Sequence, residues 1–147
     1  TVISTEFASV PGEFVVVESS SDIFALDLIG KATNTLVEPV TIDLDAFASE
    51  HSEDEYWMAG FYNHEGQAEN GTAYGENIFS DEDLGRVVSD ANKNQLGLDY
   101  QYRGEDLRVR VTESGYVQVF QPSEWGTPSF IRYINEQIEP FFHEGEI

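Results

Sequence analysis

The chain has no cysteine, a single methionine and only two lysines, Lys31 and Lys93, among its 147 residues. Without cysteine it can form no disulfide, thiolate metal site or thiol nucleophile, which fits an intracellular or virion protein better than a small secreted scaffold. Basic side chains are scarce in general: 7 Lys plus Arg face 28 Asp plus Glu, a formal net charge of -21. Such a charge repels phosphate backbones and anionic lipids, so neither nucleic acid nor a membrane is an expected direct ligand.

Long apolar runs are also missing. No stretch approaches the roughly 20 residues of a membrane-spanning helix, and residues 1–11 lack the basic and apolar parts of a signal peptide. We therefore expect a soluble protein, cytoplasmic or part of a virion. The chain does contain 40% hydrophobic and 13% aromatic residues, the composition of a folded globule and not of a disordered acidic tail. At this length, one domain over residues 1–147 is expected.

Catalytic motifs are absent as well. The sequence has no Gly-x-Ser-x-Gly, no phosphate-binding Gly-rich loop with Lys and no His-Glu-x-x-His. A metal could be held by His51, Asp54 and His64, but their spacing matches no recognised ligand pattern. The chain is therefore predicted to be non-catalytic, with no cofactor and no metal site. Carboxylate pairs are uninformative, because among 28 acids some pair has any separation that glycoside hydrolysis requires.

The most regular pattern covers residues 96–121 and predicts a three-stranded antiparallel meander with one aliphatic face. A two-residue turn at residues 104–105 would set Asp99 opposite Arg110. A three-residue loop at 113–115, with Gly in the left-handed conformation, would set the valines of the second and third strands opposite each other. Both turns, chosen independently, leave apolar pairs on one face and polar pairs on the other.

A helix over residues 128–139 is predicted to cover that aliphatic face. Apolar residues recur in it at helical spacing, Pro128 suits its first turn, and Pro140 stops it. Segregated strands and helices with antiparallel pairing predict an α+β fold rather than a βαβ nucleotide-binding domain.

Two further short helices are expected. The first begins at the capping-box pattern Ser52-Glu53-Asp54-Glu55 and runs to Phe61. The second opens with the acids of residues 80–83, where the helix dipole favours negative charge, and ends near residues 92–94.

Shorter stretches are predicted as strands or loop. Residues 13–18 and 22–29 are apolar runs expected to form two strands that could pair. Residues 40–45 alternate with period two as a third strand, although residues 46–48 could turn this stretch into helix. Residues 63–77, with three glycines among polar residues, predict a long surface loop.

The feature with the most functional content is a block of uncompensated acids. The 54 residues between Lys31 and Arg86 contain 13 Asp or Glu and no Lys or Arg. Aromatic residues interrupt the block, and aromatic anchors rimmed by charge are typical of protein interfaces. The alternative for these aromatic residues is core packing, which is favoured for Trp57 and Phe61 over Tyr62 and Tyr74. The candidate binding residues are Glu50, Glu53, Asp54, Glu55, Tyr62, Glu65, Glu69, Tyr74, Glu76, Asp81, Glu82 and Asp83.

These residues predict a non-catalytic acidic binding protein, a DNA-mimic-like inhibitor that occupies the basic surface of a nuclease, another nucleic-acid-binding protein or a defence protein. A first alternative is a structural or assembly subunit that contacts other virion proteins of a salt-adapted virus, because abundant acids with almost no Lys are typical of proteins from brine. A second is a halophile enzyme with an unrecognised site. The plain alternative for the acids is a solvated surface. Arg103, Arg108 and Arg110 could clamp an anion, but structural ion pairing is favoured.

Overall fold

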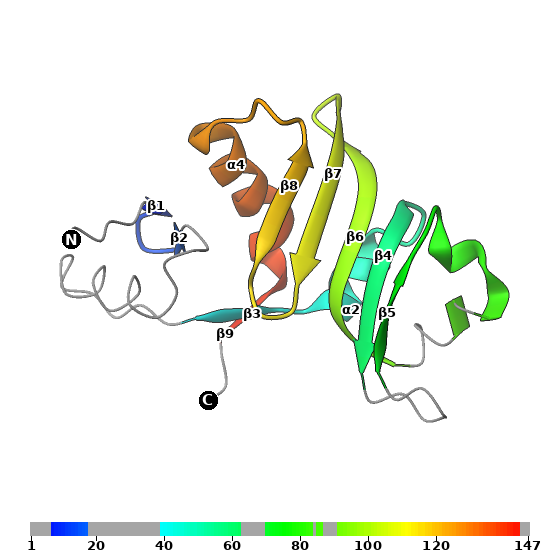
Figure 1. Ribbon diagram of the computed structural model, residues 1–147. Helices are drawn as coiled ribbons and strands as arrows, with labels where there is room; N and C mark the ends of the chain where they lie inside the picture. Colours follow the sequence, from blue (N-terminus) through cyan, green and yellow to red (C-terminus); the bar gives the residue numbers. More distant parts are fainter. Residues whose placement is uncertain (1–6, 18–38, 63–69, 84, 87–90, 145–147) are drawn as a thin grey trace, which may run out of the picture.

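The computed structural model describes residues 7–17, 39–62, 70–83, 85–86 and 91–144. Within them the chain has an α+β fold around a five-stranded antiparallel sheet in the order β5-β4-β6-β7-β8 (Figure 1). The strands are β4 (Glu55–Tyr62), β5 (Gly71–Tyr74), β6 (Asn92–Tyr102), β7 (Glu105–Thr112) and β8 (Val117–Gln121). No helix in this part of the chain is long and apolar enough to span a membrane.

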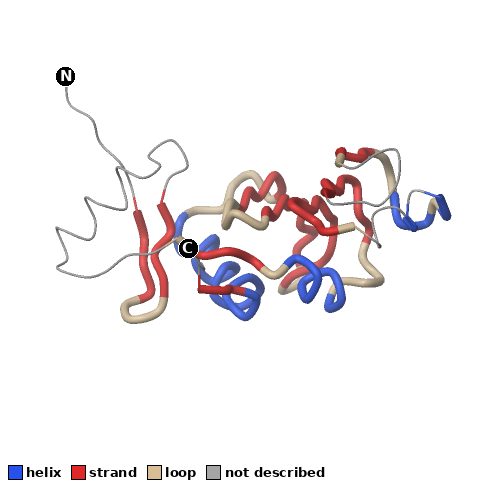
Figure 2. The backbone as a smooth tube through the Cα atoms, turned by 90° about the horizontal axis from the view of Figure 1, so that it is seen from below, coloured by secondary structure: helices blue, strands red, loops and turns tan. Residues whose placement is uncertain are grey.

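The other elements lie around this sheet. Two short ladders join β1 (Phe7–Val10) with β2 (Phe14–Val17) and β3 (Val40–Ile42) with β9 (Phe142–Glu144). The helices are α2 (Leu44–Glu50), the 3-10 turn η2 (Ile78–Ser80), and a C-terminal helix made of α4 (Thr127–Tyr133), the π-helical η3 (Ile134–Ile138) and the 3-10 turn η4 (Glu139–Phe141). Figure 2 shows α2 and the C-terminal helix on the same side of the sheet.

The side of the sheet that faces these helices is called the core face. Leu96, Leu98, Val109 and Val111 of the meander are fully buried there, in one cluster with residues of the C-terminal helix. Tyr133, Ile134 and Ile138 are the buried residues of that helix. The prediction that a helix at residues 128–139 covers the aliphatic face of the meander is thus confirmed.

A pair of tyrosine hydroxyls joins this helix to the sheet. The hydroxyls of Tyr100 on β6 and Tyr133 on α4 are 2.7 Å apart, and Tyr100 also donates to Gln137 Oε1 at 3.3 Å. Burial raises the pKa of both tyrosines, so both stay protonated over the usual pH range. The hydrogen bonds satisfy polar groups that would otherwise destabilise the core.

The turn between β6 and β7 differs from the predicted one. It is centred on Arg103 and Gly104, whose positive φ angles of 51° and 80° are those of a type I′ turn. The turn predicted at residues 104–105 is therefore wrong by one residue and the register by two, so that Asp99 lies opposite Arg108 and not Arg110. Because a shift of two keeps every side chain on its face, the aliphatic face of the meander is the predicted one.

The second turn of the meander has the predicted register. Val109 lies opposite Val119 and Val111 opposite Val117, and Gly115 has a φ of 93°. A Cβ at Gly115 would lie 2.8 Å from the carbonyl oxygen of Val40. Glycine is therefore required here by both conformation and space.

The helix predicted from residues 52–55 to Phe61 is wrong, because residues 55–62 form strand β4. Its aromatic residues suit a pleated sheet, and Gly60 weakens a helix. Pairing with β5 on one side and β6 on the other outweighs the local capping pattern, which forms a turn after α2.

Around α2 the structure follows the alternative considered for the sequence. The strand predicted at residues 40–45 ends at Ile42, and residues 46–48 are helical. Asp43 ends the strand and starts the helix, because its side chain accepts a hydrogen bond from the Ala46 N–H at 3.1 Å.

Three further predictions have mixed outcomes. The strand at residues 13–18 is confirmed as β2, which pairs with β1. Part of the loop predicted at residues 63–77 is instead strand β5. This strand is defined by its hydrogen bonds to β4, and its own sequence is too short to show an alternating pattern. Glu82, Asp83, Gly85 and Arg86 are helical, as predicted for the second short helix. The rest of that helix, before β6 begins at Asn92, and the strand at residues 22–29 lie outside the described residues.

The opposite side of the sheet, called the outer face, carries Trp57. A β-bulge lies between Tyr56 and Met58, and Trp57 lies over Gly97, where a Cβ would be 2.7 Å from its indole. Core packing, favoured for Trp57 and Phe61 over Tyr62 and Tyr74, is found for Phe61, whereas Trp57 is half-buried outside the core cluster. The register places one row of residues across all five strands of the outer face: Tyr74, Met58, Gly97, Arg110 and Gln118.

An ion pair joins the β6–β7 turn to the C-terminal helix and leads to a testable prediction. Arg103 donates to both carboxylate oxygens of Glu136 at 2.9 and 2.7 Å, and Tyr102 adds a third hydrogen bond. The bonds from Arg103 and then Tyr102 lower the pKa of Glu136 from 4.5 to about 2. We expect an Arg103→Gln variant to raise the pKa of Glu136, measured by NMR titration of the side-chain carboxyl.

The sign of the effect on stability follows from this lowered pKa. The ionised Glu136 stabilises the fold at pH above 4.5, and this contribution is lost as the pH falls toward 2. Arg103→Gln should therefore flatten the acid limb of the stability curve. A Glu136 carboxyl that titrates near 4.5 in the unaltered protein would contradict this interpretation.

Candidate functional site

Most of the predicted binding acids gather at the end of the sheet where β4 begins. Glu53 and Asp54 lie in the turn before β4, and Glu55 is its first residue. The β4–β5 pairing continues to a hydrogen bond from Gly75 N to Trp57 O at 2.9 Å, which brings Glu76 to the same end. The Phe79 ring of η2 lies 4.5 Å from that of Tyr56, so η2 packs close to this end, and Asp81 to Asp83 follow η2 directly in the chain.

These residues, with Glu50 at the end of α2, are called the acidic end. All of its acids are exposed except Asp54, which is half-buried with Oδ2 2.7 Å from His51 Nδ1. Glu55 also lies opposite Asp99, a like charge. Two arginines of the meander pair with acids that are not members of the acidic end, Arg103 with Glu136 and Arg108 with Asp99. The carboxylates of the acidic end are therefore not the ion-pair partners of these two arginines.

Tyr74 belongs to this end, whereas Tyr62 does not. Tyr74 is the last residue of β5 and is 72% exposed, the highest value for a large apolar side chain in the described part of the chain. Tyr62 is the last residue of β4, about 23 Å from Glu55 at ~3.3 Å per residue. Glu65 and Glu69 lie outside the described residues. The structure thus brings together an exposed aromatic ring and carboxylates, without Tyr62.

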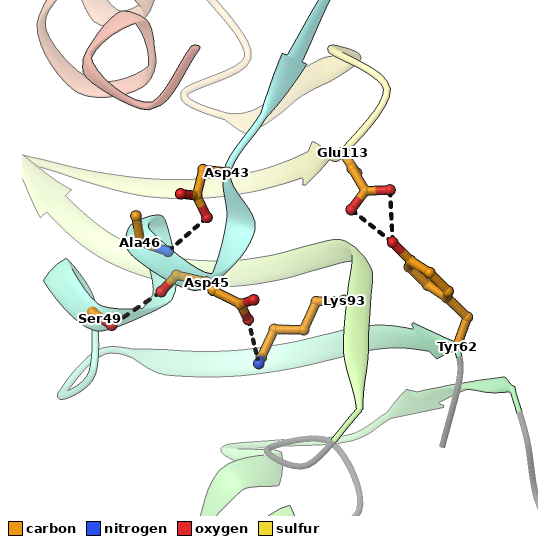
Figure 3. Close-up of polar contacts among 7 residues, drawn as sticks. All are labelled: Asp43, Asp45, Ala46, Ser49, Tyr62, Lys93 and Glu113. Carbon is orange, nitrogen blue, oxygen red and sulfur yellow. Dashed lines mark hydrogen bonds and ion pairs between the residues drawn. The ribbon is translucent and has the colours of Figure 1, made fainter. Parts of the chain in front are cut away.

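At the other end of the sheet a polar cleft of about 330 Å³ is lined by residues of β3, α2, β4, β6, β9 and the β7–β8 turn (Figure 3). Lys93 donates to Asp45 Oδ1 at 2.9 Å, although its side chain is only 10% exposed. The Tyr62 hydroxyl lies 3.0 and 3.1 Å from the two carboxylate oxygens of Glu113. Burial, then the bond to Glu113, raises the pKa of Tyr62.

Asp43 completes this cleft and is held by two partners. Its Oδ2 lies 3.2 Å from His143 Nε2, and the hydrogen bond from Ala46 N–H, with that of His143, lowers the pKa of Asp43. Every polar pair named in the cleft therefore joins a carboxylate to a donor. Such a network ties β3, α2 and the sheet together without leaving an activated nucleophile. Within the described residues, no three His, Asp or Glu side chains are placed to hold a metal ion.

A groove of about 360 Å³ beside His51 holds one arrangement known from catalysis. Asp54 orients the His51 imidazole through Nδ1, as in a hydrolytic triad. The imidazole makes tilted contacts with the rings of Phe47 and Tyr100, whose centroids are 4.5 and 4.4 Å away. The other groove-lining residues are Glu50, Glu136, Gln137, Pro140 and Phe141, which supply no hydroxyl or thiol nucleophile.

No family model matches this chain, and no curated protein or solved structure was found that resembles it. Its function must therefore be inferred from its own residues. One surface was missed in the sequence: the outer face, where Trp57 contacts both Arg108 and Phe120 across strands. An alternation of aromatic and basic residues on β7 and β8 could have indicated it, but the bulge that adds Trp57 has no local signal.

Proposed function

We propose that this chain is a non-catalytic acidic binding protein that docks the acidic end onto a basic protein. The observation that carries the proposal is Tyr74, a 72% exposed ring beside Glu76 at that end. Large aromatic side chains are the usual anchors of protein interfaces, and charged rims steer the partner. A basic nucleic-acid-binding protein or nuclease suits this surface, because its groove is built for closely spaced negative charges.

The test is binding of the whole chain to basic proteins of two kinds. Basic nucleases and DNA-binding proteins have a nucleic-acid groove, whereas cytochrome c is basic without one. We expect capture of at least one groove-bearing protein, with a Kd that rises as salt increases from about 50 to 500 mM. Capture of cytochrome c alone, or of nothing at low salt, would refute the proposal.

Charge variants make the test specific for the acidic end. Glu53→Gln, Glu55→Gln and Glu76→Gln together should weaken binding about tenfold, at roughly 0.5 kcal/mol per exposed charge. A control with the same net charge changes three exposed acids elsewhere: Glu13→Gln, Asp106→Asn and Glu124→Gln. Equal losses in the two triple variants would mean that only the overall charge attracts the partner.

A Tyr74→Ala variant tests the anchor without altering charge. A buried interface anchor contributes about 2 kcal/mol, so binding should weaken about thirtyfold. The ring makes few contacts in the free protein, being 72% exposed, so the melting temperature should not change. Unchanged affinity would place the partner elsewhere.

The two alternatives, a virion subunit and a halophile enzyme, both assume that the charge is an adaptation to salt. They predict that the fold depends on high salt, whereas the docking proposal does not. A chain adapted to brine loses its structure as salt is removed, because its carboxylates repel one another. Circular dichroism from tens of millimolar to molar salt separates the two. A fold that is retained in dilute buffer favours the docking proposal.

A further inference from the structure

The outer face combines exposed rings with arginines. Tyr74, Tyr116 and Phe120 are the exposed large apolar side chains of the described residues. The strand pairing places Tyr74 on this face, and contacts with Arg110 and Trp57 place Tyr116 and Phe120 there. Phe120 lies edge-on to Trp57 with centroids 5.8 Å apart, and the guanidinium of Arg108 lies 4.7 Å from the Trp57 ring. Arg110 lies 5.5 Å from the Tyr116 ring. Trp57, Arg108, Arg110, Tyr116 and Phe120 are called the outer patch.

The polar groups of this patch have hydrogen-bond donors to spare. Arg110 Nε donates to Gln95 Oε1 at 3.2 Å, and the Tyr116 hydroxyl donates to Gln118 Oε1 at 3.5 Å. Within the described residues, the amide nitrogens of Gln95 and Gln118 and the Nη atoms of Arg110 donate no hydrogen bond, so they are available as donors. Within the described residues, Arg110 has no carboxylate partner. A ligand for this surface must therefore be rich in acceptor oxygens.

Two buried polar atoms of the same face also lack partners. Trp57 Nε1 is an unpaired donor and Asp99 Oδ1 an unpaired acceptor within the described part of the chain. Arg108 stacks on Trp57 and forms a long ion pair of 3.6 Å with Asp99. Its side chain is 43% exposed. A hydroxyl group both accepts and donates, so a polyhydroxylated ligand that displaces Arg108 meets both needs.

The charge of the chain decides between ligands that offer oxygens. A net charge of -21 repels nucleic acids, acidic glycans and anionic lipids, and it repels a second copy of the same chain. A neutral ligand is not repelled. Sugars are recognised by aromatic rings that stack on their C–H faces and by planar hydrogen-bond donors between those rings. The outer patch offers both, and neither requires a charged ligand.

We propose that the outer patch is a binding site for a neutral polysaccharide. Sugar rings stack on Phe120 and Tyr116, and their hydroxyl and ring oxygens accept hydrogen bonds from Arg110, Gln95 and Gln118. This site goes beyond the docking of a basic protein. Tyr74 lies on β5, about 19 Å from β8 at ~4.8 Å per strand, and is not part of it.

The experiment is affinity electrophoresis in native gels, each with one soluble neutral polysaccharide: a β-glucan, a mannan, a xylan or an α-glucan. We expect at least one to retard the protein relative to a gel without polysaccharide. A Tyr116→Ala/Phe120→Ala variant should bind about tenfold more weakly, and Arg110→Gln should also bind more weakly. Both rings are partly exposed, and circular dichroism checks that the variants fold.

Matched controls localise the effect. Tyr74→Ala removes an exposed ring at the far edge, and Arg132→Gln removes an exposed arginine of α4. Both should bind like the unaltered protein. The proposal is overturned if no neutral polysaccharide retards the chain, if only alginate, a polyanion, does so, or if the controls lose as much as the patch variants. Self-association in sedimentation velocity that the patch variants abolish would make a second copy the occupant. Tyr74→Ala also separates the two proposals, since it should affect only protein docking.

Discussion

Replacement of Phe47 by alanine is expected to lower the free energy of unfolding by about 3–5 kcal/mol, the usual cost of removing a buried phenylalanine ring. Phe47 is fully buried on α2, and its ring meets that of Phe141 edge-on with centroids 5.5 Å apart. It also contacts the His51 ring. The variant thus opens a cavity between α2 and the C-terminal helix. Urea unfolding measures the loss, and the melting temperature should fall by roughly 10 °C.

Phe120→Ala is the matched control, because it deletes the same ring from a position that is 39% exposed. Less apolar surface returns to water and no cavity forms, so a loss of about 1 kcal/mol or less is expected. If the two alanine variants were equally stable, α2 would not be packed against the core as described.

Gly97→Ala should be the second most damaging of the proposed substitutions, at about 1–3 kcal/mol. The new Cβ would lie 2.7, 2.8 and 2.9 Å from three atoms of the Trp57 indole, closer than carbon atoms approach without a shift. Trp57 must move away, and it then loses its contacts with Arg108 and Phe120. Denaturant unfolding gives the cost. Tryptophan fluorescence in a Trp125→Phe background reports the movement of Trp57.

A double-mutant cycle shows whether Trp57 is the cause. In a Trp57→Leu background the added methyl group has room. Alanine also gives the unfolded chain less conformational entropy than glycine does, which favours the folded state. Gly97→Ala should there be neutral or stabilising. Gly126→Ala serves as a control, since its Cβ would meet only Pro128 at 3.8 Å. A cost that persists in the Trp57→Leu background would assign the effect to the backbone.

The sequence predicted best where turn chemistry and alternation agree. The valine pairs of β7 and β8 follow from Gly115, and the faces of all three meander strands from their period of two. The register of β6 and β7 could not be predicted from the sequence. The pattern is equally compatible with Gly104 as the first or as the second central residue of the turn. The choice depends on Arg103 in a left-handed conformation, bonded to Glu136, 33 residues later in the chain.

Long-range pairing explains the larger errors. Residues 52–61 contain a helix-start pattern, yet β4 forms because β5 and β6 bond to both of its edges. For the candidate site, η2 and the acids after it are positioned by long-range packing, such as the contact of Phe79 with Tyr56. The outer patch depends on a bulge at Trp57 and on Gly97, 40 residues apart in sequence. None of these contacts has a signal within a single segment.

The ladder of β3 with β9 has a consequence for how the chain folds. Beside this ladder, the side chains of Asp43 and His143 meet at a sequence separation of 100 residues. Closing so long a loop costs conformational entropy before the contacts of the ladder contribute favourable free energy. The ladder should therefore assemble after the local meander. A chain still emerging from the ribosome therefore exposes the unpaired edge of residues 40–42 until residues 142–144 can pair with it, and deletion of residues 142–144 should favour aggregation over a partly folded monomer.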